Sequence, residues 1–97
     1  MGYTLSQKAE EDIIATFLYG VGQFGLQQAE HYHDLLEHSF QFLAENPMAA
    51  RLRNEISPPV RIHPIESHII IYTVEADSDV FIIRVRHRFE DWLGDSA

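Results

Sequence analysis

A single β-strand is predicted by the stretch Val80-Phe81-Ile82-Ile83-Arg84-Val85-Arg86-His87-Arg88, which follows the turn-forming run Asp77-Ser78-Asp79. Successive side chains of a strand point to opposite faces of the sheet. One face would therefore carry an apolar set that suits a core: Phe81, Ile83, Val85 and His87. The other face would carry Val80, Ile82, Arg84, Arg86 and Arg88, so that three guanidinium groups follow one another at a spacing of about 7 Å.

This row of arginines is unusual in a chain with 15 acidic and 7 basic residues and a formal net charge of -8. Like charges along one strand repel each other unless negative groups lie nearby. One interpretation is that the row is paired within the chain, with Glu66, Glu75, Glu90 or Asp91. The other is an open strip beside Trp92 that binds an anion or a protein, since arginine and tryptophan are typical of the energetic centres of interfaces.

Length and composition favour one folded domain spanning residues 1–97, because 45% of the residues are hydrophobic. The chain has no cysteine, which excludes disulfides and suits a reducing cytoplasm. No signal peptide and no membrane-spanning run is visible.

The first 48 residues hold one base and seven acids. A chain with this charge should be repelled by phosphate backbones, so we expect no direct sequence-specific nucleic-acid binding and a basic protein partner for the acidic half.

Two helices are predicted in the first half of the chain. The first begins after Ser6, a good N-cap residue, and should stop near Gly20-Val21-Gly22. Its apolar stripe consists of Ala9, Ile13, Phe17 and Val21, widened by Ile14 and Leu18. The second helix should run from about residue 25 to residue 46, where Asn46-Pro47 ends it. A short turn between two helices predicts an antiparallel hairpin.

The second half of the chain reads as strands. One more helical turn is expected at residues 48–53, followed by strands at 60–64, 67–75 and 80–88. This order predicts an α+β domain, in which an N-terminal helical hairpin packs on one face of a small antiparallel β-sheet.

Several local strings resemble the ParE branch of the RelE/ParE toxin superfamily, the plasmid-stabilisation toxins. They are Leu5-Ser6-Gln7-Lys8-Ala9-Glu10-Glu11-Asp12, Gly25-Leu26-Gln27-Gln28-Ala29-Glu30 with Tyr32, Leu43-Ala44-Glu45-Asn46-Pro47, Arg53-Asn54-Glu55-Ile56, Val60-Arg61, Ser67-His68-Ile69-Ile70-Ile71-Tyr72, and Ile83-Arg84-Val85-Arg86-His87-Arg88-Phe89-Glu90-Asp91-Trp92. The resemblance implies a type II toxin that inhibits DNA gyrase without cofactors or catalytic residues. It also implies a hetero-oligomer with a ParD-like antitoxin that holds the toxin inactive.

The RelE branch shares this fold but cleaves messenger RNA on the ribosome, so the fold alone does not choose between the branches. RelE-like ribonucleases use lysines and arginines over the sheet and a tyrosine in the C-terminal tail. Here no lysine follows Lys8, no tyrosine follows Tyr72, and the strand before Tyr72 reads Ile69-Ile70-Ile71. Only Arg88 and, more loosely, Arg61 lie where such a ribonuclease would carry a basic residue. Gyrase inhibition is therefore the preferred function, with an mRNA endoribonuclease or a decayed homologue that only binds antitoxin as alternatives.

The expected target-binding residues are Arg84, Arg86, His87, Arg88 and Trp92. The expected antitoxin-binding residues are Phe17, Leu18, Phe24 and Arg61. No metal site is expected, because His31 and His33 point to different faces of their helix. His63 and His68 flank a hairpin, where we expect them to be solvated at the sheet edge. His87 is either a buried, hydrogen-bonded core residue, which is the preferred reading, or a direct contact to the target.

Overall fold

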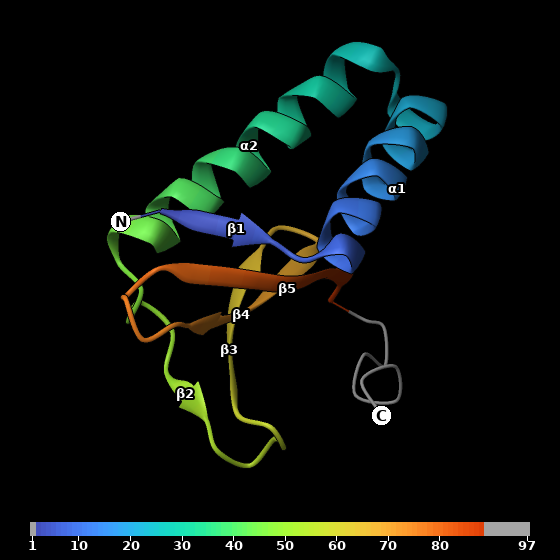
Figure 1. The fold of residues 1–97 in the computed structure, drawn as a ribbon. Helices are drawn as coiled ribbons and strands as arrows, with labels where there is room; N and C mark the ends of the chain where they lie inside the picture. The colour runs from blue at the N-terminus through green and yellow to red at the C-terminus, as the bar shows by residue number, and fades with distance from the viewer. Residues whose placement is uncertain (1, 89–97) are drawn as a thin grey trace.

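The computed structural model describes residues 2–88, which form two helices on a five-stranded sheet (Figure 1). Helix α1 spans Gln7–Phe24 and helix α2 spans Leu26–Glu45. The sheet comprises β1 (Tyr3–Leu5), β2 (Leu52–Arg53), β3 (Val60–Ile65), β4 (His68–Val74) and β5 (Val80–His87). The predicted α+β hairpin-on-sheet architecture is confirmed. Within residues 2–88, no helix is long and apolar enough to cross a membrane.

Helix α1 begins where the sequence predicts. The Ser6 side chain accepts a hydrogen bond from the Ala9 backbone N–H at 2.9 Å, which satisfies one of the unpaired donors of the first turn. The same hydroxyl donates to the carbonyl of Ile83 at 2.6 Å. Ser6 therefore caps the helix and also ties its first turn to β5.

The prediction that helix α1 stops near Gly20 and Gly22 is wrong, because the helix continues to Phe24. A Cβ atom at Gly20 would lie 3.3 Å from the Cβ of Ala29 in α2. Gly20 thus permits close approach of the two helices instead of ending the first one. The turn between the helices is the single residue Gly25.

Gly25 has φ 90° and ψ 164°, a backbone conformation that is essentially restricted to glycine. A Cβ there would touch nothing within 4 Å, so Gly25→Ala introduces backbone strain alone. We expect this variant to lose about 2 kcal/mol of unfolding free energy, measured by urea denaturation. Gly22→Ala is the matched control, because Gly22 is helical and equally open; it should gain about 0.5–1 kcal/mol. Equal effects of the two substitutions would contradict this role for Gly25.

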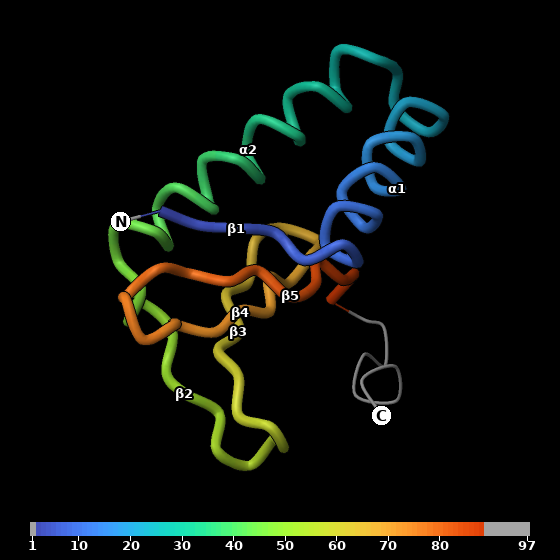
Figure 2. Tube along the Cα trace, viewed as in Figure 1, coloured from blue at the N-terminus to red at the C-terminus, as the bar shows by residue number. Residues whose placement is uncertain are grey.

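The sheet has the strand order β1-β5-β4-β3-β2. Neighbours from β5 to β2 are antiparallel, as predicted, but β1 joins the edge of β5 in parallel, so the sheet is mixed. Figure 2 shows the first and the last strand of the described chain side by side at this edge. The helical turn expected at residues 48–53 is wrong, since Leu52 and Arg53 pair with β3.

The core lies between the helices and one face of the sheet. Its sheet side chains are Ile65, Ile70, Tyr72, Val80, Ile82 and Val85, and its helical side chains are Ala9, Ile13, Leu36, Phe40 and Leu43. Of the predicted stripe on α1, Ala9 and Ile13 are buried, whereas Ile14 and Leu18 are 60% and 63% exposed. The core thus holds the first half of α1, and the second half extends beyond it.

Strand β5 contains a bulge that changes the predicted assignment of faces. Tyr72 pairs with Ile82, whereas Ile71 pairs with Arg84, so Ile83 is an extra residue. Before the bulge, Val80 and Ile82 are buried in the core, and their predicted place on the open face is wrong. After the bulge, the predicted parity holds: Val85 is buried, and alternation places the arginines on the opposite face.

Candidate protein-binding site

The first arginine of the row is paired within the fold, with a residue that the sequence did not suggest. Arg84 Nε and Nη2 donate to the two carboxylate oxygens of Asp12 at 2.8 and 3.1 Å. The backbone N–H of Val85 donates to the same carboxylate at 3.0 Å. Only 18% of the Arg84 side chain and 16% of the Asp12 side chain are exposed. The expectation that Arg84 lies open is therefore wrong. Asp12 is a partner that was not considered, and Glu90 and Asp91, two of the expected partners of the row, lie outside the described residues.

The other two arginines lie at the end of β5. Arg86 is half-buried and pairs in register with Ile69, and Arg88 is exposed just beyond the strand. The backbone N–H of Arg88 donates to the carbonyl of Ser67 at 2.9 Å, and its Nη1 donates to the carbonyl of Glu66 at 3.0 Å. Arg88 is thus attached to the turn between β3 and β4. The expected partner Trp92 lies outside the described residues.

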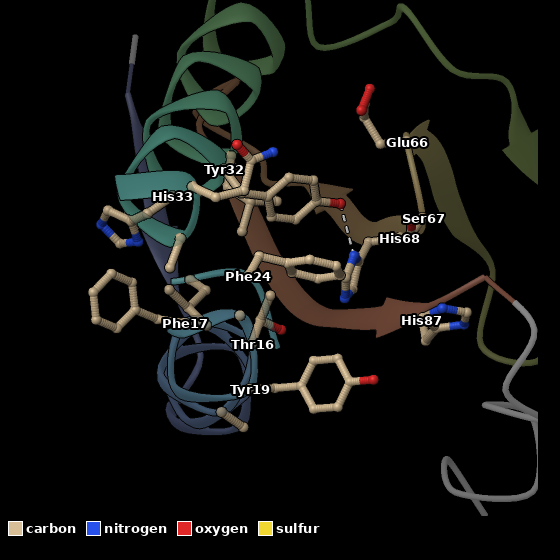
Figure 3. A pocket seen from close by; sticks show the side chains of 16 residues that line it. Thr16, Phe17, Tyr19, Phe24, Tyr32, His33, Glu66, Ser67, His68 and His87 are labelled. Atoms are coloured by element: carbon tan, nitrogen blue, oxygen red, sulfur yellow. Dashed lines mark hydrogen bonds between the residues drawn. The ribbon is translucent and has the colours of Figure 1, made fainter. Parts of the chain in front are cut away.

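A histidine pair lies beside these arginines, on the face that carries the helices. His68 at the start of β4 is the register partner of His87 at the end of β5, and their ring centroids are 5.5 Å apart. The Tyr32 hydroxyl of α2 lies 2.7 Å from His68 Nδ1 (Figure 3). Burial raises the pKa of Tyr32 above its ordinary value. His87 is exposed, so its preferred reading as a buried core residue is wrong; His68 is half-buried rather than solvated at an edge.

The histidine pair borders a cleft of about 590 Å³ between the helical hairpin and the adjoining ends of β4 and β5. Figure 3 shows this cleft, which the two helices and the β3–β4 turn enclose. Its apolar part is lined by Ile13, Phe17, Gly20, Phe24, Ala29 and Leu36. Its polar end is formed by Tyr32, Glu66, Ser67, His68 and His87. A cleft of this size, with apolar walls and a few polar groups, is typical of a binding site.

The outer part of α1 exposes large apolar side chains. Leu18 and Phe24, two of the expected antitoxin contacts, are 63% and 69% exposed, and Tyr19 is 66% exposed. Phe17 is half-buried with its ring edge-on to His33. Large exposed apolar side chains of this kind are typical of an interaction surface.

Arg61, the fourth expected antitoxin contact, lies apart from this surface, in β3. Its Nη1 donates to the carbonyl of Ala50, and its side chain is half-buried. The neighbouring His63 is half-buried against the ring of Phe42, and this burial lowers the pKa of the imidazole. The structure therefore places Phe17, Leu18 and Phe24 on the outer part of α1, with Phe17 and Phe24 lining one cleft, and it places Arg61 apart from them in β3.

Comparison with known proteins shows which family the chain belongs to. The family of ParE toxins of type II toxin–antitoxin systems (parDE) matches residues 3–92. The chain belongs to the ParE toxin family. Toxin ParE1 of Mycobacterium tuberculosis is 30% identical over 89 residues, covering 92% of this chain and 91% of the relative. Toxin ParE1 of Caulobacter vibrioides is 29% identical over 86 residues, covering 89% and 88%.

A solved structure has a similar fold. A chain of the chromosomal ParDE toxin–antitoxin system from P. aeruginosa superposes with a TM-score of 0.75 and 21% identity, covering 90% of this chain and 95% of that one. At this identity the likeness concerns the fold. The recognition of a ParE-like toxin from sequence strings is confirmed by the family match.

The strand that leads to Tyr72 in this ParE toxin carries apolar rather than basic residues on its outer face. Ile69 is half-buried and Ile71 is 3% exposed, and alternation places both on the face away from the helices. Tyr72 points to the core instead and is fully buried. Its hydroxyl donates to the Pro47 carbonyl at 3.0 Å and lies 3.4 Å from the donating Ala50 N–H. Tyr72 is thus a structural residue.

Sequence reasoning missed Asp12, Tyr32 and His68 as members of this region. Asp12 lies 72 positions from Arg84, and Tyr32 lies 36 positions from His68, so no local sequence pattern predicts these contacts. The sequence offers one indication for Asp12, which is its position in the first turns of α1. This part of the helix follows directly after β1, the strand that pairs with β5. Among residues 2–88, no group of three or more metal-ligating side chains is placed to hold an ion.

Proposed function

We propose that this toxin inhibits DNA gyrase by binding it, and that a ParD-like antitoxin neutralises the toxin by covering its exposed surface. The main support for this proposal is that the chain belongs to the ParE family. The apolar Ile69 and Ile71 and the structural use of Tyr72 support binding over RNA cleavage, because phosphodiester cleavage needs groups that move protons and neutralise charge. Gyrase acts on the chromosome, so the proposal places the toxin in the cytoplasm.

The proposed gyrase contact is the end of β5, with Arg86, His87 and Arg88, together with Trp92. Arg84 contributes indirectly, because its bond to Asp12 holds this strand in place. Binding here would favour the state of gyrase with cleaved DNA over the resealed state, which is a population shift rather than a reaction.

The proposed antitoxin contact is the exposed part of α1, with Leu18 and Phe24 at its centre and Phe17 beside them. An amphipathic antitoxin helix fits such a surface. The acidic first half of the toxin favours basic residues in the antitoxin segment that flanks this contact. Arg61 stays a predicted contact for a segment of the antitoxin that reaches β3.

A supercoiling assay tests the proposed function directly. Purified toxin should block DNA supercoiling by gyrase and trap cleaved DNA, and the antitoxin should restore supercoiling. Codon-specific transcript cuts after induction, with unaffected supercoiling, would instead support the ribonuclease. Normal growth after induction without antitoxin would support a decayed homologue.

Removing the two arginines at the end of β5 should weaken gyrase inhibition. We expect the variant with Arg86→Ala and Arg88→Ala to need about tenfold more toxin for half-inhibition, because interface arginines typically contribute more than 1 kcal/mol. Arg51→Ala is the matched control, since Arg51 is 68% exposed in an ion pair with Glu55. Unchanged potency of the double variant would remove these arginines from the target surface.

A further inference from the structure

The helical hairpin carries a second hollow that adjoins the apolar cleft. Its lining residues are Phe17 of α1 and Glu30, His33 and Asp34 of α2, and we call it the acidic hollow. Phe17 and His33 also line the cleft, and their ring centroids are 6.0 Å apart in an edge-to-face contact. Figure 3 shows both rings on the side of the hairpin away from His87. The cleft and the acidic hollow are therefore neighbouring parts of one surface.

The cleft offers depth to an apolar side chain. Leu36 and Ala29 line it and are only 1% and 4% exposed. Gly20 lines it too, and this residue has no side chain that would fill the space towards α2. The exposed Phe24 forms part of the same wall, so the cleft continues the apolar surface of α1 that we propose for the antitoxin. A side chain from that partner can thus bury apolar area in the cleft.

Glu30 and Asp34 are exposed carboxylates without a cation. They lie four positions apart on α2, where like charges repel each other and destabilise a helix. Among residues 2–88, neither of them takes part in an ion pair. The single base in the first half of the chain is Lys8, which precedes Phe17 by roughly 13 Å along α1. Positive charge from a partner would therefore relieve a repulsion that the toxin leaves uncompensated.

The side chains around the two carboxylates select the kind of cation. The half-buried ring of Phe17 lines the acidic hollow, and a cation over the face of an aromatic ring is attracted by its π electrons. His33, which also lines the hollow, interacts with Glu37 at 3.7 Å on the same helix. A planar guanidinium group can stack on a ring and donate to two carboxylates at once, whereas an ammonium group acts as a point charge. Arginine thus fits the acidic hollow better than lysine.

We propose that an arginine of the antitoxin binds in the acidic hollow, between the Phe17 ring and the carboxylates of Glu30 and Asp34, while an apolar side chain next to it fills the cleft. The inference rests on the proposed function, in which an antitoxin covers this part of the toxin. It assigns the basic residues expected in the antitoxin to one place on α2. A second copy of the toxin fits this surface poorly, because two acidic surfaces repel each other.

Three capped dipeptides test the surface without the antitoxin. They are acetyl-phenylalanyl-arginine amide, its citrulline analogue, which keeps the shape of the side chain but has no charge, and acetyl-alanyl-arginine amide, which lacks the ring. The measurement is an NMR shift titration of the full chain at pH 8, above the range in which histidines usually take up protons. We expect the first peptide to bind about fivefold more tightly than each of the others, with a smaller charge preference at high salt. Equal affinities of the arginine and citrulline peptides would overturn the proposal, as would equal affinities of the two arginine peptides.

Substitutions show which carboxylates are responsible. Glu30→Gln together with Asp34→Asn should abolish the preference for arginine over citrulline. The matched control is Glu10→Gln together with Glu11→Gln, which removes the same charge from exposed residues of α1 outside both hollows and should keep the preference. Because the pair on α2 repels itself, its neutralisation should leave the urea midpoint unchanged or higher. A preference that persists in the first variant, or that disappears equally in the control, would overturn the proposal.

The antitoxin separates this inference from the proposed function. Its affinity for the toxin should fall about tenfold when Glu30 and Asp34 are neutralised, and should stay within about twofold in the control variant. An antitoxin that binds both variants equally well would overturn the inference and leave the proposed function intact. Self-association of the toxin through this surface, detected by analytical ultracentrifugation and lost with Phe17→Ala, would also overturn the inference. Failure to restore supercoiling with the wild-type toxin would overturn the proposed function, whatever the peptides do.

Discussion

Asp12→Ala should destabilise the toxin more than any other single substitution of an acidic residue in α1. The carboxylate of Asp12 binds two nitrogen atoms of Arg84 and the backbone N–H of Val85, and both side chains of the pair are mostly buried. Removing the carboxylate of Asp12 takes two hydrogen bonds from the mostly buried Arg84 and one from the backbone N–H of Val85. The expected loss is about 3 kcal/mol of unfolding free energy, measured by urea denaturation.

Two variants separate the ion pair from general effects of charge. Glu10→Ala removes an exposed acid from the first turn of α1 and should change stability by less than about 0.5–1 kcal/mol. Asp12→Asn keeps an oxygen acceptor of the same shape and should lose less than Asp12→Ala. A loss of similar size for Glu10→Ala and Asp12→Ala would show that Asp12 acts through the helix dipole rather than through β5.

Removing the exposed apolar side chains of α1 should release the antitoxin. Leu18 and Phe24 are more than 60% exposed, so they contribute little to the core but offer large apolar area to a partner. Central interface residues of this kind contribute about 1–2 kcal/mol each. The variant with Leu18→Ala and Phe24→Ala should therefore bind the antitoxin about 100-fold more weakly in a calorimetric titration.

The matched control for this pair is Met48→Ala. Met48 is an equally exposed apolar residue, at 67%, but lies beyond α2 rather than on α1. It should leave antitoxin affinity within about threefold, and the double variant itself should unfold at nearly the wild-type urea concentration. Antitoxin binding that survives in the double variant would move the interface away from α1.

The periodicity of the sequence was sufficient for the order and type of most elements. Apolar residues at helical spacing located α1 and α2, and β-branched runs between turn residues located β3, β4 and β5. The end of α1 was misplaced because Gly20 has a packing role against Ala29, which local propensity does not register. The first strand, Tyr3–Leu5, has only three residues, which carry too little pattern to reveal a parallel partner.

The candidate site was less predictable, since it depends on contacts between distant residues. One extra residue, Ile83, moved Val80 and Ile82 to the helical face, and a strict two-residue alternation cannot detect such a bulge. The ion pair of Arg84 and the bond between Tyr32 and His68 join separate elements. The predicted roles, gyrase binding by Arg86 and Arg88 and antitoxin binding by the α1 residues, stay predictions that the assays described above will test.

The parallel pairing of β1 with β5 also sets the order of events during synthesis. Gly2 is bonded to Asp79, 77 positions later, so the first strand emerges from the ribosome long before its partner exists. The helices can form locally in the nascent chain, but their cover on the sheet is incomplete until residues 80–87 arrive. A translation product that stops before residue 80 thus lacks β5, the strand that lies between β1 and β4 in the sheet, and the surface proposed to poison gyrase is assembled only after β5 has been made.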